Sequence, residues 1–130
     1  MFVNDCLNVN EKGHLTIGGC DTLELAKEFG TPLYVMDEAT IRNTCKSYVN
    51  SIKTHYDGKG LPMYASKALS CKALVQLADS ENMGLDVVSG GEIYTAMKAN
   101  FPPEKIQFHG NNKTCLLYTS DAADDMQCVD

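Results

Sequence analysis

The feature that most constrains the fold of this chain is a regular alternation of short apolar runs with longer amphipathic segments. Apolar runs of strand length lie at residues 32–36, 61–65, 85–88 and 106–109. Helices are predicted between them, and the connecting loops are short. Because such alternation builds parallel sheets through right-handed crossovers, we predict an α/β fold. The alternation alone does not separate an open doubly wound sheet from a closed barrel.

Two of the predicted helices carry signals at their first residues. Asp37 is placed to cap a helix whose apolar residues recur in steps of three and four: Ile41, Cys45, Tyr48 and Ile52. This spacing predicts one buried face, and the glycine-rich residues 57–60 end the helix. Further on, Ser89-Gly-Gly-Glu92 predicts a capping box, in which the Glu92 carboxylate accepts a hydrogen bond from the Ser89 amide.

Charge and hydropathy exclude several classes of function. The 130 residues include 11 basic and 17 acidic side chains, for a formal net charge of −6, and no basic stripe typical of nucleic-acid binding. No apolar run approaches the ~20 residues of a membrane-spanning helix. The first residues lack the basic flank and apolar stretch of a signal peptide. We therefore expect a cytoplasmic protein that binds neither nucleic acid nor membrane.

The cysteines do not follow a disulfide or metal-binding pattern. They stand at positions 6, 20, 45, 71, 115 and 128, so no CxxC pair occurs, and the three histidines add no zinc spacing. We predict reduced cysteines, several of them packed as small apolar side chains, and no metal site. No GxGxxG or Walker loop follows a predicted strand, which argues against a nucleotide-binding site.

Polar residues follow the predicted strands, where parallel α/β folds hold their ligands. The clusters are Asp37, Ser66-Lys67, Asp86 with Ser89–Glu92, and His109-Gly-Asn111-Asn112. Lys67 is the most suggestive, because a desolvated lysine amine can form an imine with an aldehyde. Each residue also has a structural interpretation: a solvated loop lysine for Lys67, a cap or ion-pair partner for Asp86, and a packed, hydrogen-bonded ring for His109.

Taken together, these clusters resemble one family. The motifs that carry the resemblance are Tyr64-Ala-Ser-Lys-Ala68, Gly84-Leu-Asp-Val-Val-Ser-Gly-Gly-Glu92 and Phe108-His-Gly-Asn-Asn-Lys113, with Gly30-Thr-Pro-Leu-Tyr-Val35 ahead of them. In this order and at these intervals they are similar to the diaminopimelate decarboxylases, a branch of the fold type III enzymes that use pyridoxal 5′-phosphate (PLP). The resemblance covers roughly residues 5 to 114.

The resemblance implies a fold, a cofactor and a reaction. The family has a PLP-binding (β/α)8 TIM barrel followed by a β-domain, and works as a homodimer. By its motif, Lys67 matches the lysine that holds PLP, Asp86 an acidic residue near that lysine, and His109 and Asn111 a strand-end motif facing the cofactor. The family removes the carboxylate at the D-configured centre of the amino acid meso-diaminopimelate, giving L-lysine and CO2.

The same resemblance divides the chain. Residues 1–30 correspond to an N-terminal leader, with a helix between Asp21 and Gly30, that in the family associates with the β-domain. Residues 31–114 correspond to a truncated barrel of about the first four strand–helix units, where a closed barrel needs ~250 residues. Residues 115–130 instead resemble the translation of a transposase-type sequencing-library adapter, and we predict that they are not native; the alternative is a genuine helix or loop. A fragment of this kind is expected to be inactive alone.

Three other functions stay open from the sequence. The first is another fold type III decarboxylase, acting on ornithine, arginine or carboxynorspermidine. The second is a PLP-binding protein without catalysis, against which the stretch from Phe2 to Cys20 argues, since such a leader belongs with a second domain. The third is a fragment that binds no cofactor.

Overall fold

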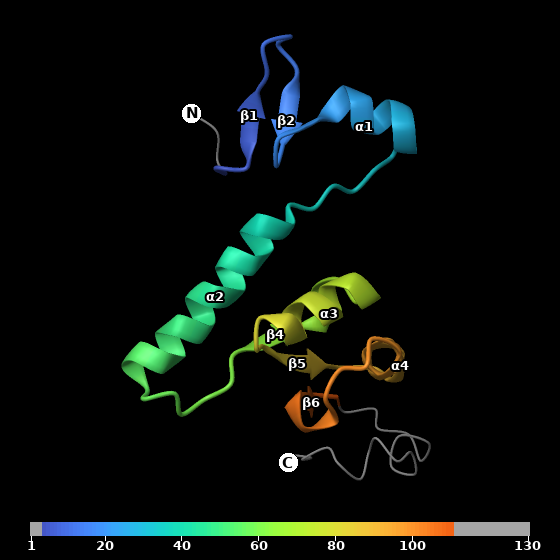
Figure 1. Ribbon diagram of the computed structural model, residues 1–130. Helices are drawn as coiled ribbons and strands as arrows, with labels where there is room; N and C mark the ends of the chain where they lie inside the picture. The colour runs from blue at the N-terminus through green and yellow to red at the C-terminus, as the bar shows by residue number, and fades with distance from the viewer. Residues whose placement is uncertain (1–3, 111–130) are drawn as a thin grey trace. The chain divides into compact units, whose positions relative to one another are not determined.

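The computed structural model describes residues 4–110 and divides the chain into two compact units, residues 1–44 and 45–130 (Figure 1). Each unit is described by itself. Asn111 and the whole of the 115–130 tail lie outside the described residues. The predicted non-native tail therefore stays a prediction. The predicted boundary at residue 30 also stays a prediction, since the division at residues 44 and 45 separates compact units and does not test a leader.

The first unit holds a small antiparallel sheet that the sequence analysis does not predict. Its strands are β1 (Leu7–Val9), β2 (Leu15–Ile17) and β3 (Cys20–Asp21), in the order β1-β2-β3. The turn between β2 and β3 is Gly18-Gly19, and both residues have positive φ, a conformation that glycine adopts without strain. Strands of two or three residues contain too few side chains to show an alternating pattern, which is why the sheet escapes prediction.

Helix α1 (Thr22–Phe29) confirms the helix predicted between Asp21 and Gly30, and it follows β3 directly. Its N-cap is Asp21, whose carboxylate accepts hydrogen bonds from the amides of Leu23 and Glu24. The same carboxylate lies 2.8 Å from His14 Nδ1. This histidine contact, together with the weaker bonds, lowers the pKa of Asp21 to about 2. The cap therefore stays ionised, as a helix N-terminus favours.

The strand predicted at residues 32–36 is not formed, and that prediction is wrong. The segment has no regular secondary structure, and neither described sheet includes it. Tyr34 in its middle is 98% exposed. A strand depends on pairing its backbone groups with a neighbour, and an apolar run alone does not supply one.

Helix α2 (Glu38–His55) confirms the helix predicted after Asp37, whose carboxylate caps it by accepting from the Thr40 amide at 2.8 Å. Of the predicted apolar face, Cys45 is buried while Tyr48 is 60% exposed.

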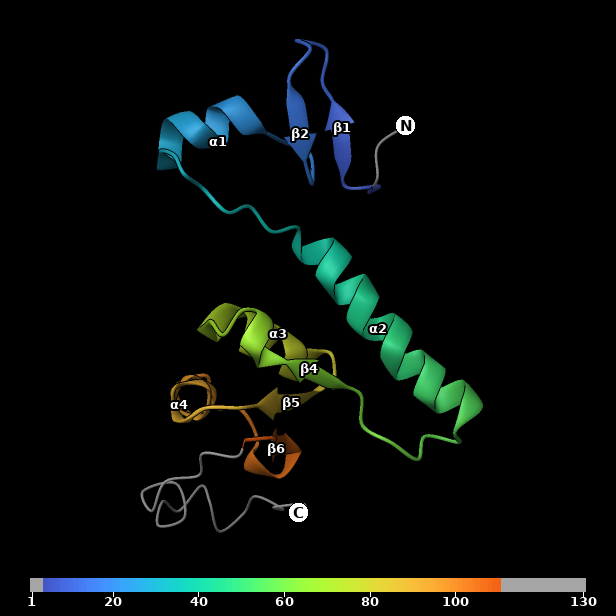
Figure 2. The ribbon, with the colours of Figure 1, turned by 180° about the vertical axis from the view of Figure 1, so that it is seen from behind.

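The second unit is built on three parallel strands (Figure 2). They are β4 (Met63–Ala65), β5 (Gly84–Val87) and β6 (Ile106–Phe108), in the order β4-β5-β6. Between β4 and β5 lie the 3-10 turn η1 (Ser66–Ala68) and helix α3 (Lys72–Ser80); between β5 and β6 lie helix α4 (Gly90–Lys98) and the turn η2 (Pro103–Lys105). Three of the four predicted strands are thus present, with the predicted helices between them.

The two faces of this sheet differ in character. Strands β5 and β6 share four buried hydrophobic residues. They are Leu85 and Val87 on β5 and their partners Ile106 and Phe108 on β6. Helices α3 and α4 supply further buried side chains to this core, including Leu74, Val75, Ile93 and Ala96. Because side chains alternate along a strand, Asp86 and Gln107 point to the other face. The sequence therefore folds into one apolar face under the helices and one polar face opposite.

Candidate functional site

Three of the predicted site residues lie at the carboxyl-terminal edge of the β4-β5-β6 sheet. Lys67 is in the middle of η1, directly after β4; Asp86 is the third residue of β5; and His109 follows β6. Since the three strands run parallel, their carboxyl ends meet at one edge. The topology thus gathers residues from three separate motifs, at the edge where parallel α/β folds bind ligands.

Lys67 is presented on a short turn whose neighbours are held in place. Its side chain is exposed, and its amine makes no hydrogen bond or ion pair within residues 4–110. Ser66 before it is fully buried. Behind the turn, the Tyr64 hydroxyl donates to the Leu69 carbonyl oxygen at 2.9 Å, and burial, with a smaller effect of Cys71, raises the pKa of this phenol. The phenol therefore stays protonated and serves as the donor that closes this turn.

Asp86 and His109 form a pair between neighbouring strand ends. Asp86 Oδ1 lies 2.6 Å from His109 Nδ1, and the His109 amide donates to the Val87 carbonyl oxygen at 2.8 Å. An ionised carboxylate only accepts hydrogen bonds, so Nδ1 carries the proton and donates it. The Asp86 side chain is 24% exposed and that of His109 57% exposed. The pair fixes the orientation of the imidazole, and Nε2 makes no hydrogen bond to any residue of the described range 4–110.

A third carboxylate lies behind this edge. Glu92, in the first turn of α4, is only 6% exposed. Its Oε1 accepts from the Ser66 hydroxyl at 2.6 Å, and its Oε2 accepts from the Val88 amide at 3.0 Å and from the Ser89 hydroxyl at 2.6 Å. Burial alone would raise the pKa of this carboxyl, but these hydrogen bonds together lower it below its ordinary value. Glu92 is therefore a buried, ionised and well-satisfied carboxylate.

The sequence analysis anticipates this carboxylate in part. Ser89 does cap α4, accepting from the Glu92 amide, as the capping box predicts. The reciprocal bond differs, since the amide that donates to the Glu92 carboxylate belongs to Val88 and not to Ser89. The bond to Ser66 joins residues 26 positions apart, and no local pattern reveals such a contact.

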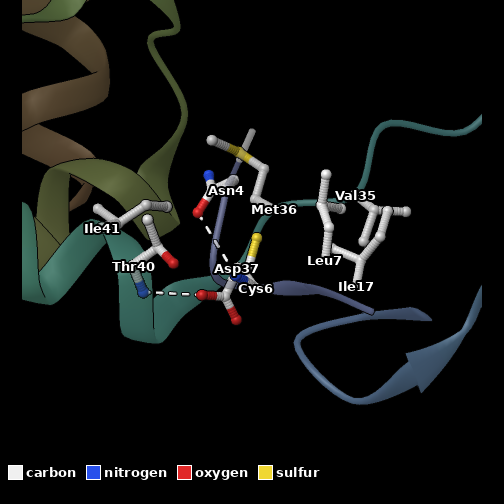
Figure 3. A pocket seen from close by; sticks show the side chains of 9 residues that line it. All are labelled: Asn4, Cys6, Leu7, Ile17, Val35, Met36, Asp37, Thr40 and Ile41. Carbon is white, nitrogen blue, oxygen red and sulfur yellow. Dashed lines mark hydrogen bonds between the residues drawn. The ribbon is translucent and has the colours of Figure 1, made fainter. Parts of the chain in front are cut away.

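The described pocket lies elsewhere in the chain. Figure 3 shows a cavity of about 280 Å³ in the first unit, lined mainly by apolar side chains from β1 and β2, the segment before α2 and the first turn of α2. Its principal polar group, Asp37, is engaged in capping α2. Of the polar clusters predicted from the sequence, Asp37 lines this pocket, whereas Lys67, Asp86 and His109 do not.

Over residues 4–110, no group of three or more His, Cys, Asp or Glu side chains could hold a metal ion. Cys6, Cys20, Cys45 and Cys71 form no disulfide with one another. Within the same residues, no helix combines the length and apolar character needed to cross a bilayer.

Comparison with known families decides what kind of domain this is. The model of the pyridoxal-dependent decarboxylase family, for its pyridoxal binding domain, matches residues 38–127. The chain belongs to this family. The match includes Lys67, Asp86, Glu92 and His109, and it also extends into the tail.

Individual relatives point to one branch of the family. The chain is 53% identical over 117 residues to the diaminopimelate decarboxylase of Bacillus methanolicus and 52% identical to that of Bacillus subtilis, in each case over 88% of this chain and 26% of the relative. A crystal structure of diaminopimelate decarboxylase from M. jannaschii matches with a TM-score of 0.70 and 40% identity, over 83% of this chain and 25% of that one. The chain thus spans about a quarter of the length of these relatives.

These findings confirm the predicted fold class and cofactor. The α/β fold is a partial barrel belonging to the pyridoxal-binding domain of the family, and the cofactor of that domain is pyridoxal phosphate. The residues present fit the cofactor chemically, because the Lys67 amine at the sheet edge has no partner within residues 4–110 and can react with an aldehyde. At the same edge, the contact with Asp86 fixes the orientation of the His109 ring.

Proposed function

We propose that this chain is the N-terminal part of a diaminopimelate decarboxylase, which removes CO2 from meso-diaminopimelate and leaves L-lysine. The observation that carries the proposal is the gathering of Lys67, Asp86 and His109 at one sheet edge of a pyridoxal-binding domain. The 53% and 52% identity to the two Bacillus diaminopimelate decarboxylases supports diaminopimelate as the substrate among the amino acids that such enzymes decarboxylate.

Each residue at the edge has a chemical task in this proposal. When bound, pyridoxal phosphate supplies the electron sink that accepts the electron pair of the broken carbon–carbon bond. Lys67 holds the cofactor through Nζ and, once substrate has displaced it, carries a proton on the same atom. Asp86 accepts the Nδ1 proton of His109 and so holds the imidazole face toward the ligand. Asn111, which follows His109 in the same motif, is a further proposed cofactor contact.

The proposal extends to the organisation of the whole protein. Residues 1–30 act with a later β-domain, residues 31–114 form the first part of the barrel, and residues 115–130 are non-native. The whole enzyme is a cytoplasmic homodimer. Resequencing the source locus across the Thr114 codon, without a transposase-made library, tests the tail. A reading frame that runs on into further barrel strands supports the proposal, and a gene that ends at Asp130 contradicts it.

The activity is tested in a chimera that has the full length of a relative. In this chimera, residues 1–114 of this chain replace the matching segment of the Bacillus methanolicus diaminopimelate decarboxylase. We expect the chimera to release L-lysine and CO2 from meso-diaminopimelate far faster than it decarboxylates ornithine or arginine. Borohydride reduction followed by peptide mass spectrometry should find the pyridoxyl group on Lys67. The Lys67→Ala chimera is the matched control.

The possible results separate the alternatives. Preference for ornithine or arginine would replace diaminopimelate with another substrate of the family. A pyridoxyl adduct without turnover of any of the three amino acids would favour a non-catalytic cofactor-binding role. A folded chimera without an adduct on Lys67 would overturn the assignment of the lysine. The 130-residue chain alone is expected to show no decarboxylase activity.

A further inference from the structure

The Glu92 carboxylate joins three parts of the chain behind the catalytic edge. Ser66 directly follows β4, Val88 directly follows β5, and Ser89 is the N-cap of α4. All three residues donate a hydrogen bond to the Glu92 carboxylate. The carboxylate is therefore the common acceptor for two strand ends and one helix start. Figure 2 shows α4 beside the end of β5, where this junction lies.

Two of these donors are close neighbours of the residues that carry the proposed chemistry. Ser66 directly precedes Lys67, and Val88 stands two residues after Asp86. The Ser66 hydroxyl also lies 3.0 Å from the Asp86 carbonyl oxygen, so it bridges β4 and β5. A hydroxyl has a single proton, and the shorter distance, 2.6 Å, is to the charged Glu92. Glu92 thus orders the hydroxyl that lies between the backbones of Lys67 and Asp86.

A capping role alone does not account for this arrangement. An N-terminal cap needs the Ser89 hydroxyl and gains from an acid that remains in solvent near the first turn. Glu92 is instead 6% exposed and turned inward toward Ser66, which is fully buried. Burying a carboxylate is costly unless hydrogen bonds compensate. Here three hydrogen bonds do so, from the Ser66 and Ser89 hydroxyls and the Val88 amide.

We propose that Glu92 is a positioning residue that sets the Lys67 amine relative to Asp86, acting through the Ser66 hydroxyl and the Val88 amide. The inference rests on the proposed function for its catalytic consequence. Its structural part, the placement of Lys67, does not depend on which amino acid is the substrate. Glu92 itself touches neither cofactor nor substrate in this proposal.

The test uses the chimera with Glu92→Gln, Ser66→Ala and the double variant. Glutamine keeps the size of the side chain but removes its charge, and its NH2 group either reverses the bond to the Ser66 hydroxyl or leaves the Val88 amide without an acceptor. We expect Glu92→Gln to lower kcat about 10-fold or more with little change in KM, as misplacement of a reacting group does. The visible circular dichroism of the bound cofactor should change as well. Because Ser66 carries part of the effect of Glu92 on Lys67, the two substitutions remove the same contact. The double variant should therefore have a kcat little lower than that of Glu92→Gln alone.

A second readout is independent of catalysis. The labelling rate of Lys67 by an amine-reactive reagent, measured on cofactor-free protein by peptide mass spectrometry, reports the environment of its amine. The exposed Lys53 on α2 serves as the internal reference. We expect Glu92→Gln and Ser66→Ala to change the labelling rate of Lys67 at least about 3-fold relative to that of Lys53. A 3-fold change in rate corresponds to less than ~1 kcal/mol in activation free energy.

The matched control is Asp79→Asn, which removes a partly buried carboxylate that pairs with Lys105 at 3.1 Å at the opposite edge of the sheet. It should lower the melting temperature without altering kcat, the dichroism or the labelling of Lys67. Equal effects of Asp79→Asn and Glu92→Gln on these readouts would overturn the positioning role, as would a strictly additive double variant. If the parent chimera lacks decarboxylase activity, the proposed function fails, while the labelling rates still decide the role of Glu92.

Discussion

The two edges of the β4-β5-β6 sheet use charged side chains in different ways. At the carboxyl edge, Glu92 is buried and accepts three hydrogen bonds, and Asp86 holds His109 at 2.6 Å. At the amino edge, Asp79 near the end of α3 pairs with Lys105 ahead of β6, and both side chains are about one-third exposed. The first edge fixes polar groups in defined positions, and the second closes the helix–strand connection with a solvated ion pair.

Glycines are tightly packed at both edges, Gly84 at the amino edge and Gly110 at the carboxyl edge, so the contrast lies in the exposure of the reactive side chains. Gly84 starts β5 at the amino edge, where a Cβ would lie 2.8 Å from Leu61 Cδ2 and 3.1 Å from the Lys105 carbonyl oxygen. Met83, directly before β5, and Phe101, in the connection between α4 and η2, are buried. At the carboxyl edge, Lys67 and His109 are exposed. The difference teaches that one sheet can separate stability from chemistry along its strands, as barrel enzymes do.

The largest expected effect is on activity, at the carboxyl edge. Lys67→Ala in the chimera should lower kcat by ~100-fold or more, because it removes both the covalent attachment and a proton-carrying amine. Since the side chain is exposed, the melting temperature of the cofactor-free protein should hardly change. Steady-state kinetics and thermal unfolding measure the two quantities. Full activity in Lys67→Ala would erase the distinction between the edges.

The next effect is on stability, at the amino edge. Gly84→Ala should destabilise the fold by about 1–3 kcal/mol, because the added methyl must displace Leu61 Cδ2, 2.8 Å away, and crowds the Lys105 carbonyl oxygen at 3.1 Å. Thermal unfolding of the cofactor-free chimera checks this.

Gly91→Ala is the matched control for that substitution. Its Cβ would have its nearest neighbour, Ser89 Oγ, at 3.9 Å, and alanine is favoured over glycine inside a helix. The substitution should therefore leave the melting temperature unchanged or raise it. A melting temperature that falls equally in both variants would show that packing at the amino edge is not special.

Acid should weaken the carboxyl edge. The pKa of Glu92 in the folded chain lies below its ordinary value of 4.5, so its hydrogen bonds stabilise the fold fully above that pH. As the pH falls through the lowered pKa, the folded state must take up the proton and this contribution is lost. The difference in melting temperature between the parent chimera and Glu92→Gln should therefore shrink as the pH falls from 6 toward 3. A difference that is constant over this range would contradict an ionised Glu92.

The sequence predicts these features unequally, and the reason is the range of the interactions involved. The cap at Asp37, the helices between the strands and the parallel strands β4, β5 and β6 follow from local patterns. The run at 32–36 has the composition of a strand but lacks a paired neighbour in either described sheet, and pairing is not a property of the run itself.

The candidate site shows the same limit. The positions of Lys67 and Asp86 after neighbouring strands could be predicted because parallel topology places strand ends together. The Asp86–His109 distance and the inward turn of Glu92 depend on side-chain contacts across 23 and 26 positions. Such contacts exist only once the sheet is formed, so the sequence shows which residues are available but not which of them meet.

The smallest expected effect is the loss of the ion pair at the amino edge. Asp79→Asn should cost about 0–1 kcal/mol, because both partners are partly solvated and the pair is screened by salt. The cost should diminish further at 1 M NaCl, where the Debye length falls to ~3 Å. Lys105→Gln should match it, since either change breaks the same contact. If Asp79→Asn instead destabilised the chimera as strongly as Glu92→Gln, the amino edge would also depend on a fixed polar group, and charge would be used alike at both ends of the strands.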